Sequence, residues 1–314
     1  MPELRVDTLY RTHSQKSYAI RVTTPPRIGF VGFGEAGYHL AKGLRTAGVE
    51  YIAAFDIADS TLIRARAEET GTILCPSNAD LAAASDIIFS TVTANQAAAA
   101  AAQTAPFLTA NHLYADLNSV SPGLKQSLAK TVEATGARFV EVAVMSAVPP
   151  HGHKVPMLTG GTAAPEFAER LKPFGMVIEV GSAQVGSAAA TKMCRSVVIK
   201  GIEALLTECV LGATHYGADE RVFSSLGESL PGIDWAKLAT YMVGRVVMHG
   251  ERRAREMEEV AETLRSAGID PIMAEATVRR MDWSARMGLK ARFGGKDPKS
   301  YQEFAEVVSG LNVP

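Results

Sequence analysis

The stretch VGFGEAG, residues 31–37, decides the fold. It joins a short apolar run to a segment with helical spacing that ends in a glycine. Its glycines follow the pattern G-x-G-x-x-G, in which the first allows a tight turn and the second lets a pyrophosphate approach the backbone. An acidic residue ends the next strand, 19 residues after the last glycine. The sequence therefore predicts a dinucleotide site formed by Gly32, Phe33, Gly34, Glu35, Ala36, Gly37 and Asp56.

The acidic residue also bears on which dinucleotide binds. The carboxylate of Asp56 can accept hydrogen bonds from both ribose hydroxyls and repels a 2′-phosphate, so we expect NAD. Arg64 and Arg66 lie in the following helix, where they could reach a 2′-phosphate, and NADP stays possible. The alternative is a structural glycine turn with a solvent-facing aspartate.

Apolar runs alternate with helical segments as far as residue 181. Eight runs read as strands: 27–34, 51–56, 72–74, 86–92, 113–117, 138–144, 156–161 and 176–181. This alternation predicts an α/β fold of the Rossmann type, with a doubly wound, mainly parallel sheet covered on both faces. Six consecutive alanines, within the helical segment 95–105, fit a helix packed closely on that sheet.

The pattern changes after Gly186. A proline-free helical segment runs from Ser187 nearly to Tyr216, and no convincing strand follows it. We expect a polar N-terminal extension over 1–26, a dinucleotide-binding domain over 27–183 and an all-helical domain over 184–314. In that last part, Met257, Val260 and Leu264 have core spacing, as do Met193 and Val197.

Composition excludes several classes of function. The chain has 314 residues with 32 basic and 33 acidic side chains, so no global field favours nucleic acid or an anionic membrane. Three scattered cysteines suit a reducing compartment. No apolar run has transmembrane length, and the N-terminus has no secretory apolar region. We expect a cytoplasmic protein with a small-molecule substrate.

Polar residues follow two further strands. Thr91, Val92, Thr93 and Gln96 come after the fourth strand, at the sheet edge where cofactor contacts arise. Asn118 and Ser119 follow the fifth strand and are candidates to bind substrate. Ordinary strand-end polarity accounts for the first group nearly as well, and a helix cap before Pro122 accounts for the second.

Four motifs occur in an informative order: VGFGEAG, DLNSVSP (116–122), FVEVAVMSAV (139–148) and GSAAATK (186–192). Over about residues 27–200 the chain resembles the β-hydroxyacid dehydrogenase family, which includes 3-hydroxyisobutyrate dehydrogenase and is related to 6-phosphogluconate dehydrogenase. The resemblance implies that Lys192 is the catalytic lysine, that Ser146 lies in the substrate-binding segment, and that the protein forms a homodimer.

The chain departs from that family at three places. Glu141 to Ala147 replaces an Asp-x-Pro-Val-Ser-Gly-Gly segment, and Ser196 stands where an asparagine commonly follows the lysine. The C-terminal part has HGERRAREMEEVAETLRSAG (249–268) where the family has a Lys-Asp segment. These departures predict a variant branch with a divergent C-terminal domain and an altered substrate.

Lys192 also stands out on chemical grounds. It lies among small and apolar residues, and burial lowers a lysine pKa toward neutrality, where the amine can act as acid or base. Arg195 and Ser196 share its helix face and are candidates to orient substrate. The alternative is a lysine whose ammonium reaches solvent along its stem.

Two other charged segments are weaker candidates. His151 and His153 lack an acidic or cysteine partner nearby, so we expect a polar loop and no metal, although these side chains or Lys154 could meet an anionic substrate. Residues 251–265 read as an amphipathic helix supported by a Glu251–Arg255 pair, in which Arg252, Arg253 or Arg255 could bind a carboxylate.

The sequence therefore predicts an NAD(P)-dependent oxidoreductase acting on a small hydroxy acid or its carbonyl form. An imine reductase of similar architecture and a non-catalytic NAD(H) sensor or scaffold stay open as alternatives.

Overall fold

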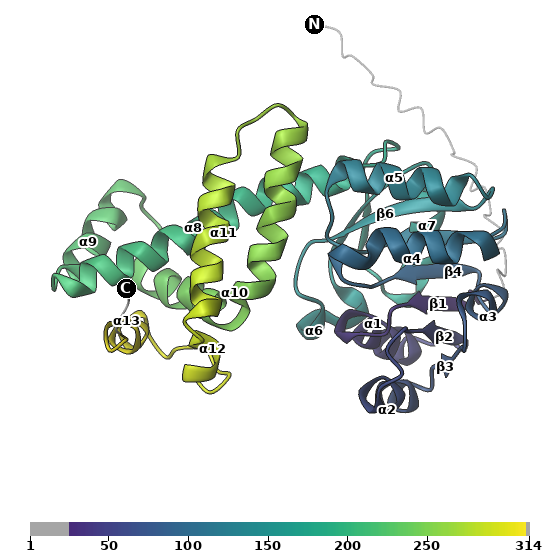
Figure 1. Cartoon of the computed structure of the whole chain (residues 1–314), viewed down its shortest axis with the longest axis horizontal. Coiled ribbons are helices and arrows are strands. Elements are labelled where there is room, and N and C mark those ends of the chain that lie inside the picture. Colours follow the sequence, from purple (N-terminus) through teal and green to yellow (C-terminus); the bar gives the residue numbers. More distant parts are fainter. Residues whose placement is uncertain (1–24, 312–314) are drawn as a thin grey trace, which may run out of the picture.

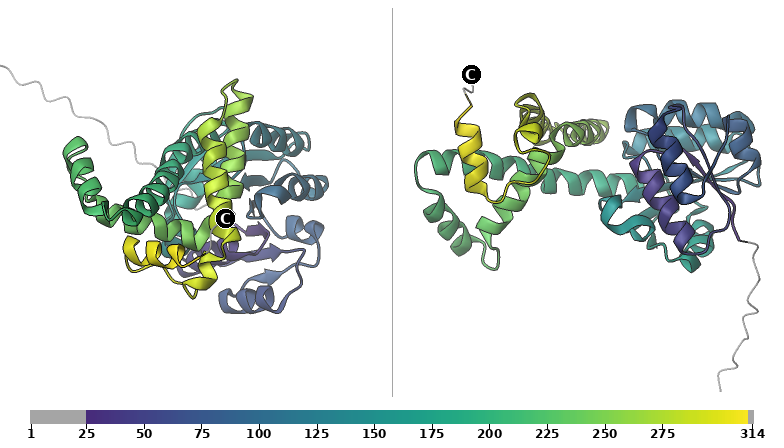
Figure 2. Two further views of the ribbon diagram at one scale, coloured as in Figure 1. Left: turned by 60° about the vertical axis from the view of Figure 1, so that its left-hand side comes forward. Right: turned by 90° about the horizontal axis from the view of Figure 1, so that it is seen from below.

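The computed structural model describes residues 25–311 (Figure 1). Nearly all of the predicted N-terminal extension lies outside these residues. A β-sheet flanked by helices occupies one end of the molecule, and a group of helices occupies the other. One long helix, α8 (Ser187–His215), leads from the sheet into the helical group (Figure 2).

The sheet contains all eight predicted strands in the order β3-β2-β1-β4-β5-β6-β7-β8. Every neighbouring pair is parallel except β6 and β7, which are antiparallel. The order reverses beside β1, so the β1 and β4 ends form the crevice where such sheets bind ligands. The strands are β1 (Ile28–Val31), β2 (Ile52–Phe55), β3 (Ile73–Leu74), β4 (Ile87–Ser90), β5 (Leu113–Asp116), β6 (Arg138–Val144), β7 (Met157–Gly160) and β8 (Ile178–Val180).

Helices cover both faces of the sheet, as predicted. On one face, α1 (Glu35–Thr46), α2 (Thr61–Thr70) and α7 (Ala164–Leu171) contribute to a core that includes Phe30 and Phe89. On the other face, α3 (Asn78–Ala83), α4 (Ala97–Thr104) and α5 (Pro122–Glu133) pack around a second core. The alanine run forms α4 and buries Ala97, Ala100 and Ala101, which confirms its close packing.

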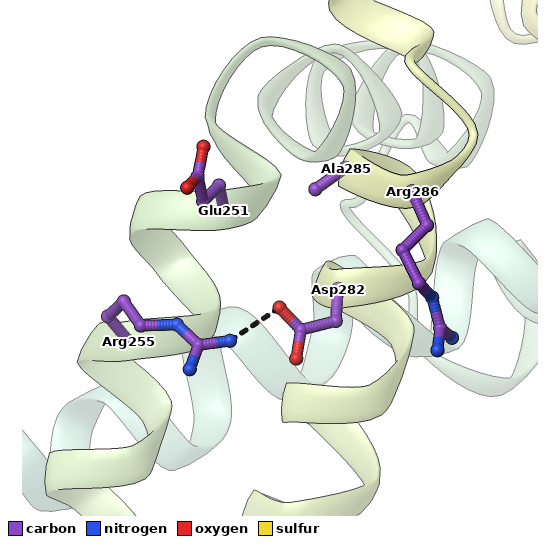
Figure 3. A pocket seen from close by; sticks show the side chains of 5 residues that line it. All are labelled: Glu251, Arg255, Asp282, Ala285 and Arg286. Carbon is purple, nitrogen blue, oxygen red and sulfur yellow. Dashed lines mark hydrogen bonds and ion pairs between the residues drawn. The ribbon is translucent and has the colours of Figure 1, made fainter.

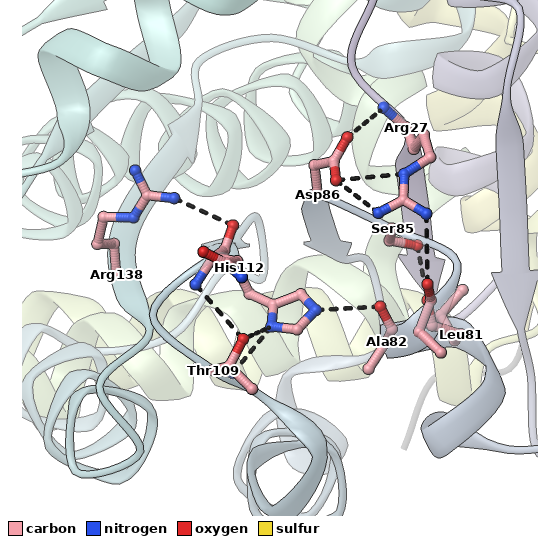
Figure 4. Close-up of polar contacts among 10 residues, drawn as sticks. Arg27, Leu81, Ala82, Ser85, Asp86, Thr109, His112 and Arg138 are labelled. Carbon is pink, nitrogen blue, oxygen red and sulfur yellow. Dashed lines mark hydrogen bonds and ion pairs between the residues drawn. The ribbon is translucent and has the colours of Figure 1, made fainter.

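Polar contacts close the amino edge of the sheet (Figure 4). Arg27, before β1, donates three hydrogen bonds to the Asp86 carboxylate, one from its backbone N–H and two from its guanidinium. The His112 ring, before β5, lies 3.0 Å from the carbonyl oxygen of Ala82 and accepts from the Thr109 N–H at 2.8 Å. These contacts occupy the amino edge of the sheet. Ligands of such sheets bind at the opposite, carboxyl edge.

The second region is all-helical within residues 187–311, as predicted. Beyond α8 it comprises α9 (Asp219–Ser229), α10 (Trp235–Ser266), α11 (Ile272–Arg286), α12 (Leu289–Arg292) and α13 (Tyr301–Ser309). The residues predicted to have core spacing, Met193, Val197, Met257, Val260 and Leu264, lie in one apolar cluster between α8, α10 and α11. Among the helices of residues 25–311, none combines the length and apolarity that a membrane span requires.

Candidate active site

The loop between β1 and α1 has the shape that a pyrophosphate requires. Gly32 has φ +85°, and a Cβ added there would lie 2.7 Å from Val92 Cγ1. A Cβ on Gly37 would lie 2.8 Å from the Gly32 carbonyl oxygen, whereas one on Gly34 would meet no described atom within 4 Å. Gly34 caps α1, so free space adjoins a helix N-terminus that favours an anion. These residues fit a dinucleotide.

Asp56 lies directly beside this loop. Its carboxylate accepts hydrogen bonds from the N–H of Phe33 at 2.7 Å and of Ala58 at 2.8 Å. The Phe33 side chain is fully buried in the core, so only its backbone belongs to the loop. Glu35 is exposed in the first turn of α1, and Ala36 is half-buried. The half-buried Asp56 is thereby fixed at the end of β2, where a ribose would lie.

The two arginines considered for a 2′-phosphate have partners of their own. Arg64 bonds to Asp59, with a 2.7 Å ion pair. Arg66 lies over the ring of Tyr38, with 5.5 Å between its guanidinium carbon and the ring centroid. Both contacts are on or near the surface, on the α2 side of Asp56.

The segment after β4 packs against the glycine loop. The hydroxyl of Thr91 donates to the Gly32 carbonyl oxygen at 2.7 Å. Val92 Cγ1 occupies the space that a Cβ on Gly32 would need. Thr93 donates to the Asn95 side chain at 2.6 Å, and Gln96 is exposed at the end of a single 3-10 turn. The structure thus brings Thr91 and Val92 against the loop, while Thr93 and Gln96 lie further out.

A buried ion pair lies at the end of β5. Lys125 of α5 and Asp116 are almost inaccessible, and Nζ lies 2.5 Å from Asp116 Oδ2. The amide nitrogen of Asn118 donates to Asp116 Oδ1 at 2.5 Å and to Ser90 Oγ at 2.9 Å. Ser119, next to it, is half-buried. Sequence reasoning missed Lys125, although its spacing to Leu128, Ala129 and Val132 puts it on the buried face of α5.

Glu141 attaches the lysine-bearing helix to the sheet. This fully buried carboxylate of β6 accepts from the backbone N–H groups of Gly186 at 2.8 Å, Ala188 at 3.0 Å and Ala189 at 3.3 Å. A helix N-terminus leaves such N–H groups without intrahelical partners and favours a negative charge. The segment predicted to bind substrate therefore begins with a helix cap, and Ser146 at its far end is exposed.

Lys192 lies in the second turn of α8 and is half-buried. Burial lowers its pKa to about 8, and the positive charges of Lys125, Lys200 and Arg252 act in the same direction. The carboxylate of Glu256 opposes them, because a negative charge stabilises the ammonium. Lys125, whose Nζ lies at the end of β5, is thus one of the charges that act on Lys192.

Glu256 of α10 holds together the positive charges near Lys192. It forms a 3.1 Å ion pair with Lys200 and a further pair with Arg252. Burial alone would raise its pKa, but the charges of Lys200, Arg252 and Lys192 outweigh this and hold the pKa at about 2. Sequence reasoning missed Lys200 and Glu256. The recurrence of polar residues on α8 every fourth position, at 192, 196 and 200, is the signal that could have found Lys200.

The two predicted substrate residues on α8 have different surroundings. Ser196 is buried, and its hydroxyl accepts from Lys200 Nζ at 3.2 Å. Arg195 is exposed. Of the two residues predicted to lie on the face of Lys192, only Ser196 contacts the buried Lys200.

The arginines of α10 are engaged in ion pairs. Arg253 is buried and donates to Glu203 of α8, with Nε 2.6 Å from Oε2. Arg255 donates to Asp282 of α11 at 2.6 Å and also pairs with Glu258, not with the predicted Glu251. Because α11 packs against α10, Arg255 pairs across to Asp282 as well as along its own helix. Arg255 and Asp282, together with Glu251, Ala285 and Arg286, line an open cavity of about 480 Å³ (Figure 3).

The histidine segment lies against α1. His153 is buried, and a Cβ on Gly43 would lie 2.1 Å from its Nδ1, so this ring packs on the helix rather than facing a substrate. The prediction of a polar loop is wrong for this residue, whereas His151 and Lys154 are exposed. Within residues 25–311 no group of three or more His, Cys, Asp or Glu side chains could hold a metal.

Comparisons with known proteins agree with this arrangement. Residues 27–193 match the family model described as the NAD binding domain of 6-phosphogluconate dehydrogenase, and residues 213–284 match a domain of unknown function. The mitochondrial 3-hydroxyisobutyrate dehydrogenase of Drosophila melanogaster is 30% identical over 216 residues, which cover 67% of this chain and 65% of that protein.

Two solved structures are similar over most of the chain. A conserved hypothetical protein from Sinorhizobium meliloti is 37% identical with a TM-score of 0.76, covering 92% of this chain and 97% of its own. A conserved protein described as structurally similar to 3-hydroxyacid dehydrogenases is 32% identical with a TM-score of 0.70, covering 84% and 99%. The chain therefore belongs to the 3-hydroxyisobutyrate dehydrogenase-like β-hydroxyacid dehydrogenases, with an NAD(P)-binding Rossmann domain and a divergent C-terminal domain.

Proposed function

We propose that this protein is an NAD(P)-dependent dehydrogenase that interconverts a small hydroxy acid and its carbonyl form, with Lys192 as the general acid/base. The observation that carries the proposal is the half-buried Lys192, whose pKa is lowered to about 8 by burial. An amine with this pKa exists in both protonation states near neutral pH, as proton transfer in both directions requires.

The chemistry follows from the residues around it. A nicotinamide cofactor held by the glycine loop and Asp56 would supply hydride-accepting and hydride-donating chemistry. Neutral Lys192 takes the hydroxyl proton during oxidation, and its ammonium returns a proton to the carbonyl oxygen during reduction. Asn118, Ser119, Ser146 and Ser196 are the proposed substrate contacts, because they lie on the segments that end at the carboxyl edge or near Lys192.

We further propose that NAD is preferred over NADP. Asp56 is fixed beside the glycine loop by two backbone N–H donors, so its charge stays where a 2′-phosphate would lie. Arg64 and Arg66, the residues that could favour NADP, are held by Asp59 and by the Tyr38 ring.

The test is turnover of a panel of 3-hydroxy acids and their semialdehydes with both cofactors, by wild type, Lys192→Ala and Lys192→Arg. Losing general acid–base catalysis costs about 10²–10⁴-fold in rate. We expect that loss in both variants, since a guanidinium does not release its proton near neutral pH. NAD affinity should be unchanged, because Gly32 to Gly37 and Asp56 hold the cofactor.

Other outcomes would assign a different function. Near-normal turnover by Lys192→Arg removes the acid/base role from Lys192. A kcat/KM ratio that favours NADP refutes the cofactor preference. Turnover of imines but not of hydroxy acids would make the protein an imine reductase, and cofactor binding without turnover of any compound would make it a sensor.

A further inference from the structure

Lys125 transfers no proton in the proposed reaction, yet it is a charged side chain buried beside the site. It is only 1% exposed and Asp116 is 0% exposed, which is rare for lysine and aspartate unless they are paired. Nζ donates to Asp116 Oδ2 at 2.5 Å and to the Asp116 carbonyl oxygen at 2.7 Å. As the ion-pair partner of the Lys125 ammonium, the Asp116 carboxylate offers only hydrogen-bond acceptors.

That carboxylate determines how the amide of Asn118 is oriented. Because Asp116 Oδ1 lies 2.5 Å away and only accepts, the group facing it must be the NH₂ of Asn118. The other close neighbour, the hydroxyl of Ser90 at 2.9 Å, can donate or accept and would tolerate either orientation. Only the Lys125–Asp116 pair therefore distinguishes the two orientations.

The fixed amide leaves one atom for a ligand. Both N–H bonds of Asn118 are directed at Asp116 and Ser90, so Oδ1 points away from them, and this buried oxygen has no hydrogen-bond partner among residues 25–311. A buried polar atom without a partner is costly unless a ligand or water satisfies it. Asn118 follows β5 by two residues, at the edge where ligands of such sheets bind.

We propose that Lys125 is a positioning residue: through Asp116 it fixes the amide of Asn118 so that Oδ1 accepts a hydrogen bond from a donor group of the bound ligand. The donor is either the hydroxyl of the substrate or the carboxamide NH₂ of the nicotinamide. This inference rests on the proposed function, because it concerns the same site.

The experiment uses the full-length protein and four variants, of which Asn118→Ser serves only to assign NMR signals. Lys125→Met leaves a buried carboxylate uncompensated and is expected to fold poorly. The double variant Lys125→Met/Asp116→Leu removes both charges and so leaves no uncompensated buried charge. The matched control is Lys130→Met, the same substitution on the exposed side of α5.

The first readout does not depend on activity. In ¹⁵N-labelled wild type and Lys130→Met, the side-chain NH₂ protons of Asn118, assigned by their loss in Asn118→Ser, should exchange slowly with solvent. In the double variant they should shift and exchange faster, because the amide is free to turn over. Unchanged NH₂ signals in the double variant would overturn the proposal.

The second readout identifies the ligand group. NADH is titrated by its fluorescence, and KM and kcat are measured with the best substrate of the panel. A loss of about tenfold or more in NADH affinity assigns the donor to the carboxamide, and a rise of that size in KM alone assigns it to the substrate. If neither ligand weakens in the double variant, Oδ1 serves no ligand and the proposal is wrong. The NMR and NADH-binding measurements need no substrate. They can therefore test the role of Lys125 even if no substrate is found and the proposed function fails.

Discussion

At the scale of single residues, burial and the charges around Lys192 set the pKa of its amine. Three positive side chains and burial lower its pKa, and one carboxylate, Glu256, raises it. The motifs were enough to single out Lys192 as a candidate, because a lysine among small residues stands out within one stretch of chain. Its charged neighbours were not predictable in that way. Lys125 and Glu256 lie 67 and 64 residues away in sequence, and only folding brings them near.

The pH dependence of the reaction tests this arrangement. In the proposed mechanism oxidation needs neutral Lys192, so its kcat/KM should rise with pH and level off above about 8, while reduction should decline above about 8. Glu256→Gln removes the charge that stabilises the ammonium, so the pKa of Lys192 falls and both inflections move to lower pH.

The control for this profile is Glu258→Gln, which removes a carboxylate two residues away that pairs with the exposed Arg255. Its inflections should coincide with those of wild type. An unshifted profile in Glu256→Gln would show that Glu256 does not act on Lys192.

At the scale of helices and strands, the sequence predicted more than it did for the site. Each strand is an apolar run bounded by turn residues, so all eight were found. The direction of β7 was not specified, because an apolar run such as PMLTGG has the same pattern whichever way it pairs. The cap on α8 was also missed. Glu141 stands in the middle of a strand, and its partners begin at Gly186, 45 residues later.

Glu141→Ala tests the link between β6 and α8. Removing a buried carboxylate that accepts three backbone N–H groups should lower the free energy of unfolding by about 2–3 kcal/mol. It should also lower kcat, because Lys192 lies in the second turn of the helix. Urea denaturation and steady-state kinetics measure both effects.

Glu179→Ala, on the exposed β8, is the matched control and should change neither quantity measurably. If Glu141→Ala is as stable and as active as this control, the cap does not position α8.

At the scale of the whole molecule, we propose that the protein is a homodimer. The helical region exposes large apolar side chains, among them Val198 at 59% and Leu205 at 57% on α8 and Tyr241 at 57% on α10. Val198 and Leu205 are seven residues apart and so share one face of α8. A second copy of the chain would cover this face.

Sedimentation equilibrium tests the dimer. Wild type should have twice the mass of one chain, and Val198→Asp/Leu205→Asp should shift toward the monomer, because burying two carboxylates in an interface is costly. Val177→Asp, an exposed apolar position beside β8, should leave the mass unchanged. A monomeric wild type, or a double variant of unchanged mass, contradicts the proposal.

The attachment of α8 at its first turn has a mechanical consequence. With 29 residues the helix is about 44 Å long, and it runs from the sheet into the helical region. A rotation about the first turn, where Glu141 binds the helix, would displace its two ends by different amounts. A tilt of about 5° at the first turn would move the far end by about 4 Å. Lys192, roughly 9 Å from that turn, would move by less than about 1 Å. A small rotation of α8 would therefore displace its far end several times further than Lys192.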